Sequence, residues 1–128
     1  MARILVVDDS AYQRLKAHRI LEEAGHVTLE AVNGRDGLER ILDDAPDCVV
    51  LDLLMPELDG IEVLREVRDQ GIATPVVVLT ADVQDTTRRL CMELGAVAVI
   101  HKPVKRDELI GTIDRLVELH AGNDEEDG

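Results

Sequence analysis

The centre of this chain is the segment Val49-Val50-Leu51-Asp52-Leu53-Leu54-Met55-Pro56, in which an apolar run ends in a single carboxylate. An apolar run of this length, bounded by turn residues, is typical of a strand buried on both faces of a parallel sheet. Asp52 then stands at the carboxyl end of that strand. Because ligands of open α/β sheets bind in the crevice outside these ends, the segment predicts a functional carboxylate at Asp52.

The same strand-like character recurs on both sides of this segment, and a helical pattern follows each strand. The predicted strands are 3–7, 27–31, 47–51, 75–79 and 97–100. The predicted helices are about 11–24, a short one around 38–42, 59–71, 84–94 and 106–119, with Ser10 and Asp59 as caps. Crossovers of helical length predict a parallel α/β sheet covered on both faces. We expect one domain over 1–121 and a disordered acidic tail at 122–128.

The composition narrows the class of protein. The chain has 128 residues, of which 45% are hydrophobic and 32% charged, as in soluble globular domains. The formal net charge of −13 disfavours nonspecific binding of nucleic acid or anionic membranes by this domain. No apolar run reaches the roughly 18 residues that span a membrane, and the start lacks a signal-peptide layout. Cys48 and Cys91 are expected to be buried free thiols, which fits a cytoplasmic protein.

Polar residues end four of the five predicted strands, and they are Asp8, Asp9, Asp52, Thr80 and Lys102. The carboxyl ends of parallel strands lie along one edge, so these groups should meet in one crevice. Three carboxylates repel unless a cation neutralises them, and an all-oxygen site that leaves room for a phosphate suits Mg²⁺. Lys102 and Thr80 can bind phosphoryl oxygens, and Asp52 can accept a phosphoryl group as a nucleophile.

Five motifs give a resemblance to a known family. They are Val7-Asp8-Asp9-Ser10, Leu51-Asp52-Leu53-Leu54-Met55-Pro56 with Asp59-Gly60, Leu79-Thr80-Ala81, Gly95-Ala96 and Lys102-Pro103. In this order and spacing they resemble the receiver domain of two-component response regulators, in the single-domain form of chemotaxis regulators, over about residues 2–120. The resemblance implies a doubly wound, flavodoxin-like (βα)5 fold with strand order 2-1-3-4-5.

The resemblance also implies a role for each residue of the crevice. Asp52 would be the phosphoacceptor and a ligand of Mg²⁺. Asp9 would bind the ion directly, Asp8 mainly through water, and the backbone carbonyl of Leu54 would be a further ligand.

Further implied roles concern the phosphoryl group. Thr80 and Lys102 would bind its oxygens, and the peptide bond between Lys102 and Pro103 would be cis. The positions of Leu54 and Asp82 modulate dephosphorylation in this family. Leu54 cannot hydrogen-bond a hydrolytic water, whereas Asp82 can, and we expect Leu54 to slow hydrolysis by crowding that water.

The chain departs from the family pattern at two positions. The aromatic residue that often precedes the lysine by three residues, and swings inward on activation, is Val99 here. The frequent phenylalanine after Lys-Pro is Val104. We therefore expect phosphorylation to draw Thr80 inward, with little change in the side-chain conformation of Val99.

The resemblance implies a signalling module rather than an enzyme with turnover, one that assists only its own phosphorylation and dephosphorylation. It would take its phosphoryl group from a histidine kinase or histidine phosphotransfer protein. It would then bind a downstream effector through the face of the fourth helix, fifth strand and fifth helix, as a monomer or a phosphorylation-dependent dimer.

Two other functions stay open at this point. One is a Mg²⁺-dependent phosphohydrolase with an aspartyl-phosphate intermediate, which is disfavoured because the acid/base position of haloacid-dehalogenase-type enzymes is Leu54 here. The other is a pseudo-receiver that binds partners without phosphorylation, which the complete set of acidic residues, Thr80 and Lys102 disfavours.

Overall fold

Five strands alternate with five helices in the computed structural model, which describes residues 1–55 and 58–127, the last eight by their backbone alone. The strands are β1 (Arg3–Val7), β2 (Val27–Ala31), β3 (Cys48–Asp52), β4 (Val76–Thr80) and β5 (Ala98–His101). The helices are α1 (Ala11–Glu23), α2 (Gly34–Asp44), α3 (Gly60–Asp69), α4 (Asp85–Glu93) and α5 (Arg106–Asp127). Pro56 of the central segment lies outside the described residues.

All neighbouring strands pair in parallel, in the order β2-β1-β3-β4-β5. This confirms the predicted doubly wound sheet and its strand order. The register places Asp52 opposite Leu79 and Thr80 opposite His101, so β3, β4 and β5 end at one edge. That shared edge is where the sequence places the functional residues.

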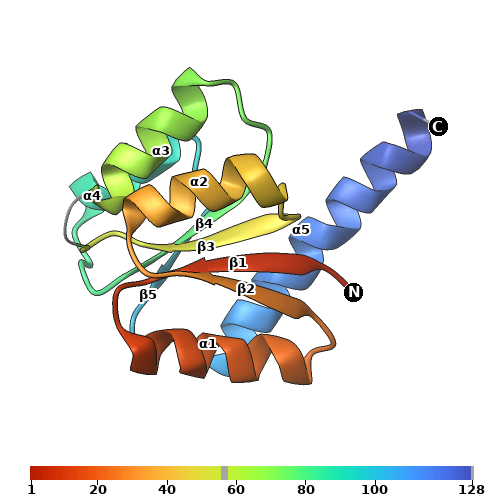
Figure 1. Cartoon of the computed structure of the whole chain (residues 1–128), viewed down its shortest axis with the longest axis horizontal. Coiled ribbons are helices and arrows are strands. Elements are labelled where there is room, and N and C mark those ends of the chain that lie inside the picture. The colour runs from red at the N-terminus through yellow and green to blue at the C-terminus, as the bar shows by residue number, and fades with distance from the viewer. Residues whose placement is uncertain (56–57, 128) are drawn as a thin grey trace.

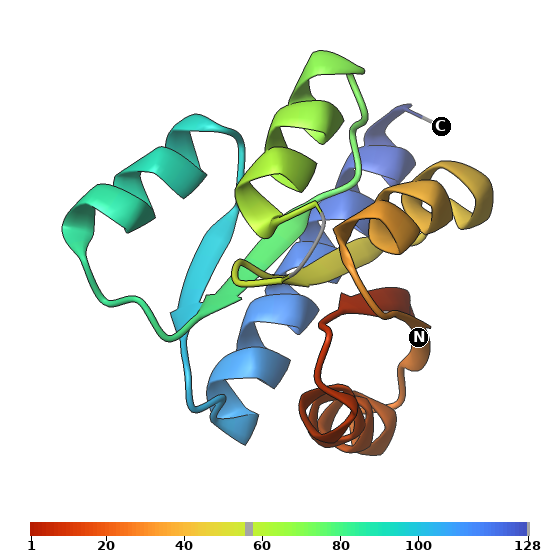
Figure 2. The same cartoon turned by 60° about the vertical axis from the view of Figure 1, so that its left-hand side comes forward.

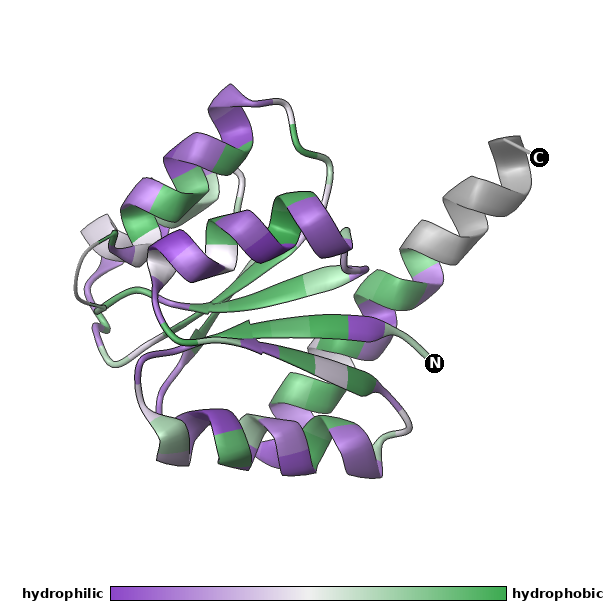
Figure 3. Cartoon of the chain, in the orientation of Figure 1, coloured by the Kyte–Doolittle hydropathy of each residue, from purple (hydrophilic) through white to green (hydrophobic). Residues whose placement is uncertain are grey.

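The helices form two layers around the sheet (Figure 1), with α1 and α5 on one face and α2, α3 and α4 on the other. Figure 2 shows the sheet between these layers from a second direction. The strands are largely hydrophobic and the outer surfaces of the helices hydrophilic (Figure 3). β1, β3 and β4 are buried on both sides, which explains their continuous Val and Leu runs.

Three helices begin at side-chain caps. The side chains of Ser10, Asn33 and Asp59 accept hydrogen bonds from the backbone N–H groups of Gln13, Asp36 and Glu62. These bonds satisfy N–H groups that a helix leaves unpaired in its first turn. The predicted caps at Ser10 and Asp59 are therefore confirmed, and Asn33 is a third.

Helix α2 ends in an unusual conformation. Ala45 has φ 45° and ψ 60°, the left-handed region that normally favours glycine. Pro46 follows at once and prevents the helix from continuing.

A buried histidine, for which the sequence predicted no role, ties the start of the chain to α5. His26 accepts a hydrogen bond at Nδ1 from the backbone N–H of Ala2 (3.1 Å), and its Nε2 lies 2.8 Å from Oδ1 of Asp114. These contacts join the residue before β1, the loop before β2 and α5 at the edge of the sheet opposite the candidate site.

Helix α5 runs to Asp127, beyond the predicted end near Leu119. The chain has no proline after Pro103 to stop the helix. The expected disorder of the tail at 122–128 stays a prediction. Among the described residues, no helix is both long enough and apolar enough to cross a membrane.

Both cysteines are free and buried, as predicted. Burial raises the pKa of Cys48 to about 12 and also raises the pKa of Cys91, so both thiols stay protonated at neutral pH.

Candidate functional site

The residues predicted at the strand ends lie at one edge of the sheet. Asp52 and Thr80 are the last residues of β3 and β4, and Asp8 and Lys102 directly follow β1 and β5. Asp8, Asp52 and Thr80 are buried, with 4%, 7% and 1% of their surfaces exposed. Polar residues this deep need bonded partners, which makes this edge the candidate functional site.

Three carboxylates form a cluster at this edge. Oxygens of Asp8, Asp9 and Asp52 all lie within 4.8 Å of one another. In the part of the chain that the structure describes, this is the one such group of possible metal ligands. Asp9 is exposed while the other two are buried, so the cluster has one side open to solvent.

Lys102 is the cation of the site. Its Nζ atom lies 3.2 Å from Oδ1 of Asp52 and 3.4 Å from Oδ2 of Asp8. Its backbone N–H donates to the carbonyl of Thr80 (2.8 Å), which fixes it beside the end of β4. The peptide bond between Lys102 and Pro103 is cis.

One ammonium does not balance this cluster. Burial raises the pKa of Asp52 above its ordinary value, and the charge of Asp8 raises it further. Lys102 and the backbone N–H of Leu54 act in the opposite direction but do not cancel the rise. An added cation would relieve this unfavourable charge, and oxygen-only ligands with one open side suit a hard ion such as Mg²⁺.

The loop after β1 is held by contacts that the sequence did not reveal. Asp8 accepts a hydrogen bond at Oδ1 from the backbone N–H of Ser10 (2.9 Å). Arg14 donates from Nη1 to the carbonyl of Asp8 (2.8 Å), and its Nε lies 3.3 Å from Oε1 of Glu30 on β2. Arg14 therefore positions the loop through the backbone carbonyl of Asp8 and the ion pair with Glu30. Its place on an amphipathic helix gave no signal of this role.

Gly60 closes the loop after β3. Its backbone N–H donates to the carbonyl of Leu53 (3.0 Å). A Cβ atom there would lie 2.6 Å from both the carbonyl oxygen of Asp52 and the Cα atom of Leu53. Only glycine permits this approach, which gives the Asp59-Gly60 pair its structural meaning. Asp59 itself caps α3 and does not belong to the carboxylate cluster.

The loop after β4 is organised by Asp82. Its backbone N–H donates to Oγ1 of Thr80 (3.0 Å). Its carboxylate accepts hydrogen bonds from the backbone N–H of Gln84 (2.9 Å) and the hydroxyl of Thr87 (2.6 Å). The bonds from Thr87 and Gln84 lower the pKa of Asp82. Sequence reasoning found Asp82 but missed Thr87, because a threonine inside a helix gives no distinctive pattern.

The remaining predicted positions surround the site. Leu54 exposes 72% of its surface, whereas Val104 is buried with 7% exposed. Val99 is partly buried and packs against the core on the α3 and α4 side of the sheet. The roles predicted for Leu54 and Asp82 in dephosphorylation, and for Val99 in switching, stay predictions.

Comparisons with known proteins agree with this geometry. The family model described as response regulator receiver domain matches residues 4–114. The response regulator MprA of Mycolicibacterium vanbaalenii is 38% identical over 95% of this chain and 53% of its own length. Protein PilH of Pseudomonas aeruginosa is 36% identical over 91% of this chain and 98% of its own. The chain thus spans about half of the first relative and nearly all of the second.

Solved structures agree as well. The receiver domain of the Francisella response regulator 1452 has a TM-score of 0.90 at 32% identity, covering 94% of this chain and 99% of its own. Vibrio cholerae chemotaxis protein CheY4 has a TM-score of 0.84 at 30% identity, covering 91% and 98%. Fold, site and sequence agree, and the chain belongs to the response regulator receiver domains of two-component systems.

Proposed function

We propose that Asp52 is the phosphoacceptor of this receiver and takes its phosphoryl group from a phosphohistidine in a Mg²⁺-dependent reaction. The observation that carries the proposal is the position of Asp52, a buried carboxylate within 4.8 Å of two others and 3.2 Å from Nζ of Lys102. Such a group combines a nucleophilic oxygen with sites for a cation and for an incoming anion.

The proposed transfer is an in-line displacement at phosphorus. A carboxylate oxygen of Asp52 forms the new O–P bond while the P–N bond of the partner's phosphohistidine breaks. The electron pair of the broken bond returns to the partner's imidazole ring. Lys102 neutralises charge on the phosphoryl oxygens, and the hydroxyl of Thr80 donates a hydrogen bond to one of them. The domain contributes positioning and electrostatics, and the carboxylate of Asp52 ends as an aspartyl-phosphate.

The oxygen ligands present fit Mg²⁺. The carboxylates of Asp8, Asp9 and Asp52 would hold the ion, together with the backbone carbonyl of Leu54. When bound, it supplies positive charge that offsets the repulsion among the carboxylates and the phosphoryl group. The ordinary affinity of Mg²⁺ for a few carboxylates and several waters supports this choice.

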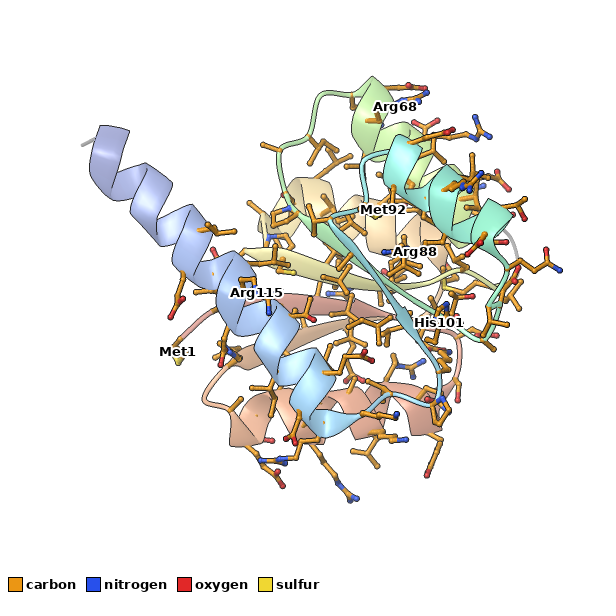
Figure 4. All side chains as sticks on the ribbon, turned by 180° about the vertical axis from the view of Figure 1, so that it is seen from behind. Met1, Arg68, Arg88, Met92, His101 and Arg115 are labelled. Carbon is orange, nitrogen blue, oxygen red and sulfur yellow. The ribbon has the colours of Figure 1, made fainter. Side chains whose placement is uncertain are left out.

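Receiver domains in general interact with histidine kinases and with downstream effectors. For this chain we propose a histidine kinase or histidine phosphotransfer protein as donor, and the face of α4, β5 and α5 as the effector surface. Figure 4 views that face, with Arg88 and Met92 of α4, His101 of β5 and Arg115 of α5 on it. The two buried thiols support a cytoplasmic location.

A small phosphodonor tests the proposal directly. The protein is incubated with acetyl phosphate and Mg²⁺, and its intact mass is measured. We expect one added phosphoryl group, which disappears in Asp52→Asn and persists in the matched control Asp59→Asn, since asparagine also caps a helix well. No adduct on the unchanged protein would overturn the proposal in favour of a phosphorylation-independent domain, and multiple turnovers of donor would indicate a hydrolase.

A further inference from the structure

Asp82 makes hydrogen bonds in two directions. Its backbone N–H holds Oγ1 of Thr80, a proposed ligand of the phosphoryl group. Its carboxylate holds the start of α4 through the N–H of Gln84 and the hydroxyl of Thr87. One residue thus connects the edge of the sheet to a helix of the proposed effector surface.

The start of α4 depends on this residue. The helix begins after Gln84, whose side chain makes no capping hydrogen bond. Within α4 only Cys91, in the second half, is fully buried. The first turn therefore has little apolar packing, and the carboxylate of Asp82 holds it by accepting hydrogen bonds from the N–H of Gln84, at the N-cap position, and from the side-chain hydroxyl of Thr87.

The bond to Thr80 can persist when Thr80 binds a phosphoryl group. Oγ1 of Thr80 accepts from Asp82, which leaves the hydroxyl hydrogen free to donate to a phosphoryl oxygen. A movement of Thr80 toward Asp52 then pulls the N–H group of Asp82 with it. The carboxylate of the same residue carries the movement to Thr87.

An alternative coupling from Thr80 to the proposed effector surface, through position 99 on β5, is weak in this chain. Val99 is small, packs against the core and carries no aromatic ring that could exchange between inward and outward positions. A short chain of hydrogen bonds from Thr80 to α4 does not require such a ring.

We propose that Asp82 couples Thr80 to α4, so that phosphorylation of Asp52 repositions the start of α4 through the hydrogen bonds that the carboxylate of Asp82 accepts from Gln84 and Thr87. The coupling rests on the proposed phosphorylation of Asp52. In it Asp82 is a positioning residue, and its carboxylate is occupied by α4 rather than directed at a hydrolytic water.

The test separates binding at the site from movement of the helix. Mg²⁺ and beryllium fluoride, an analogue of the phosphoryl group, are added to isotopically labelled protein. NMR shifts of the Thr80 and Ala81 amides report binding, and shifts of the Leu90 and Met92 methyl groups report α4. The variant Thr87→Val removes the hydroxyl while keeping a branched side chain of similar size.

In Thr87→Val we expect the amide shifts at Thr80 to remain and the population of shifted α4 to fall about fivefold, the effect of one lost hydrogen bond. Thr87→Ser should restore the α4 shifts, and Thr86→Val, an exposed neighbour outside these bonds, should match the unchanged protein. If α4 shifts fully in Thr87→Val, the coupling is wrong although the phosphoryl site stands. If neither set of resonances shifts in the unchanged protein, both this coupling and the proposed function fail.

Discussion

The ammonium nitrogen of Lys102 lies 3.2 Å from Asp52, yet the pKa of Asp52 is raised. Burial and the neighbouring carboxylate of Asp8 outweigh the single positive charge. The ionised site therefore favours binding of a further cation. In the metal-free protein, the unfavourable charge of Asp52 should lower the free energy of unfolding.

Removing the charge of Asp52 should stabilise the metal-free protein. Because the folded pKa is raised, the protonated carboxyl favours the folded state at low pH, and this advantage is lost as pH rises through the folded value. Asp52→Asn should thus be more stable than the unchanged protein at pH 7 in EDTA, with the difference shrinking as pH falls toward 3.8. Urea denaturation at a series of pH values measures it.

Asp82→Asn is the control, and it should lower the stability at pH 7 where Asp52→Asn raises it. The hydrogen bonds from Thr87 and Gln84 lower the pKa of Asp82, so its ionised form stabilises the fold at neutral pH and this contribution is lost as pH falls. A loss of stability at pH 7 in both variants would contradict our account of the carboxylate cluster.

Mg²⁺ should stabilise the folded protein through the same cluster. At about 100 times its dissociation constant, an ion that binds only the folded state adds about 2.7 kcal/mol to the free energy of unfolding. Asp9→Asn should lose most of this increment, and Asp59→Asn should retain it. Denaturant titrations with and without Mg²⁺ give the comparison, and an equal increment in Asp9→Asn would refute the metal site.

Gly60→Ala should disturb the site by displacing the loop after β3. The added Cβ would approach two backbone atoms to 2.6 Å, which forces the loop after β3 to shift at a cost of about 2 kcal/mol. Phosphorylation by acetyl phosphate should slow as well, since the loop follows Asp52 directly. Gly111→Ala is the control, because its Cβ meets nothing within 4 Å and the helix should gain about 0.8 kcal/mol. Equal effects at the two positions would argue against the close approach.

Ala45→Gly should raise stability. The left-handed conformation at φ 45° costs an alanine about 1 kcal/mol. Glycine avoids this cost, but its greater freedom in the unfolded chain offsets about half of the gain. We expect a net gain of about 0.5 kcal/mol by chemical denaturation. Ala24→Gly, at an ordinary φ of −81° in the cap of α1, should instead lose about 0.5 kcal/mol.

Leu54→Asn should shorten the lifetime of the phosphorylated protein. The exposed apolar side chain beside Asp52 offers a hydrolytic water no hydrogen bond, whereas an amide does. Decay of the phosphorylated mass after removal of the donor measures the lifetime. Leu54→Met keeps the apolar character and should leave it unchanged. An unchanged or longer lifetime in Leu54→Asn would contradict the proposed exclusion of water by Leu54.

Apolar runs and caps predicted most of this fold. The run ending at Asp52 and the cap at Asp59 were visible because each follows from a local pattern. The strand order came from the family resemblance, since local patterns do not say which strands are neighbours. The left-handed Ala45 was not foreseeable, because alanine has no local preference for that conformation.

The site was predictable in its charged groups but not in its supports. Parallel topology alone brings Asp8, Asp52 and Lys102 together, so their meeting followed from sequence. The roles of Arg14 and Thr87 depend on the exact path of two loops, which no periodic pattern encodes.

The core contains no phenylalanine, tyrosine or tryptophan, and the sole side chain of these three types belongs to Tyr12, which exposes 70% of its surface on the first turn of α1. That turn directly follows the loop of Asp8 and Asp9. Ultraviolet absorbance near 280 nm and intrinsic emission therefore both originate from one chromophore, three residues after Asp9 in the chain. Absorbance and emission in the near ultraviolet therefore report the surface turn of Tyr12 and not the interior of the protein.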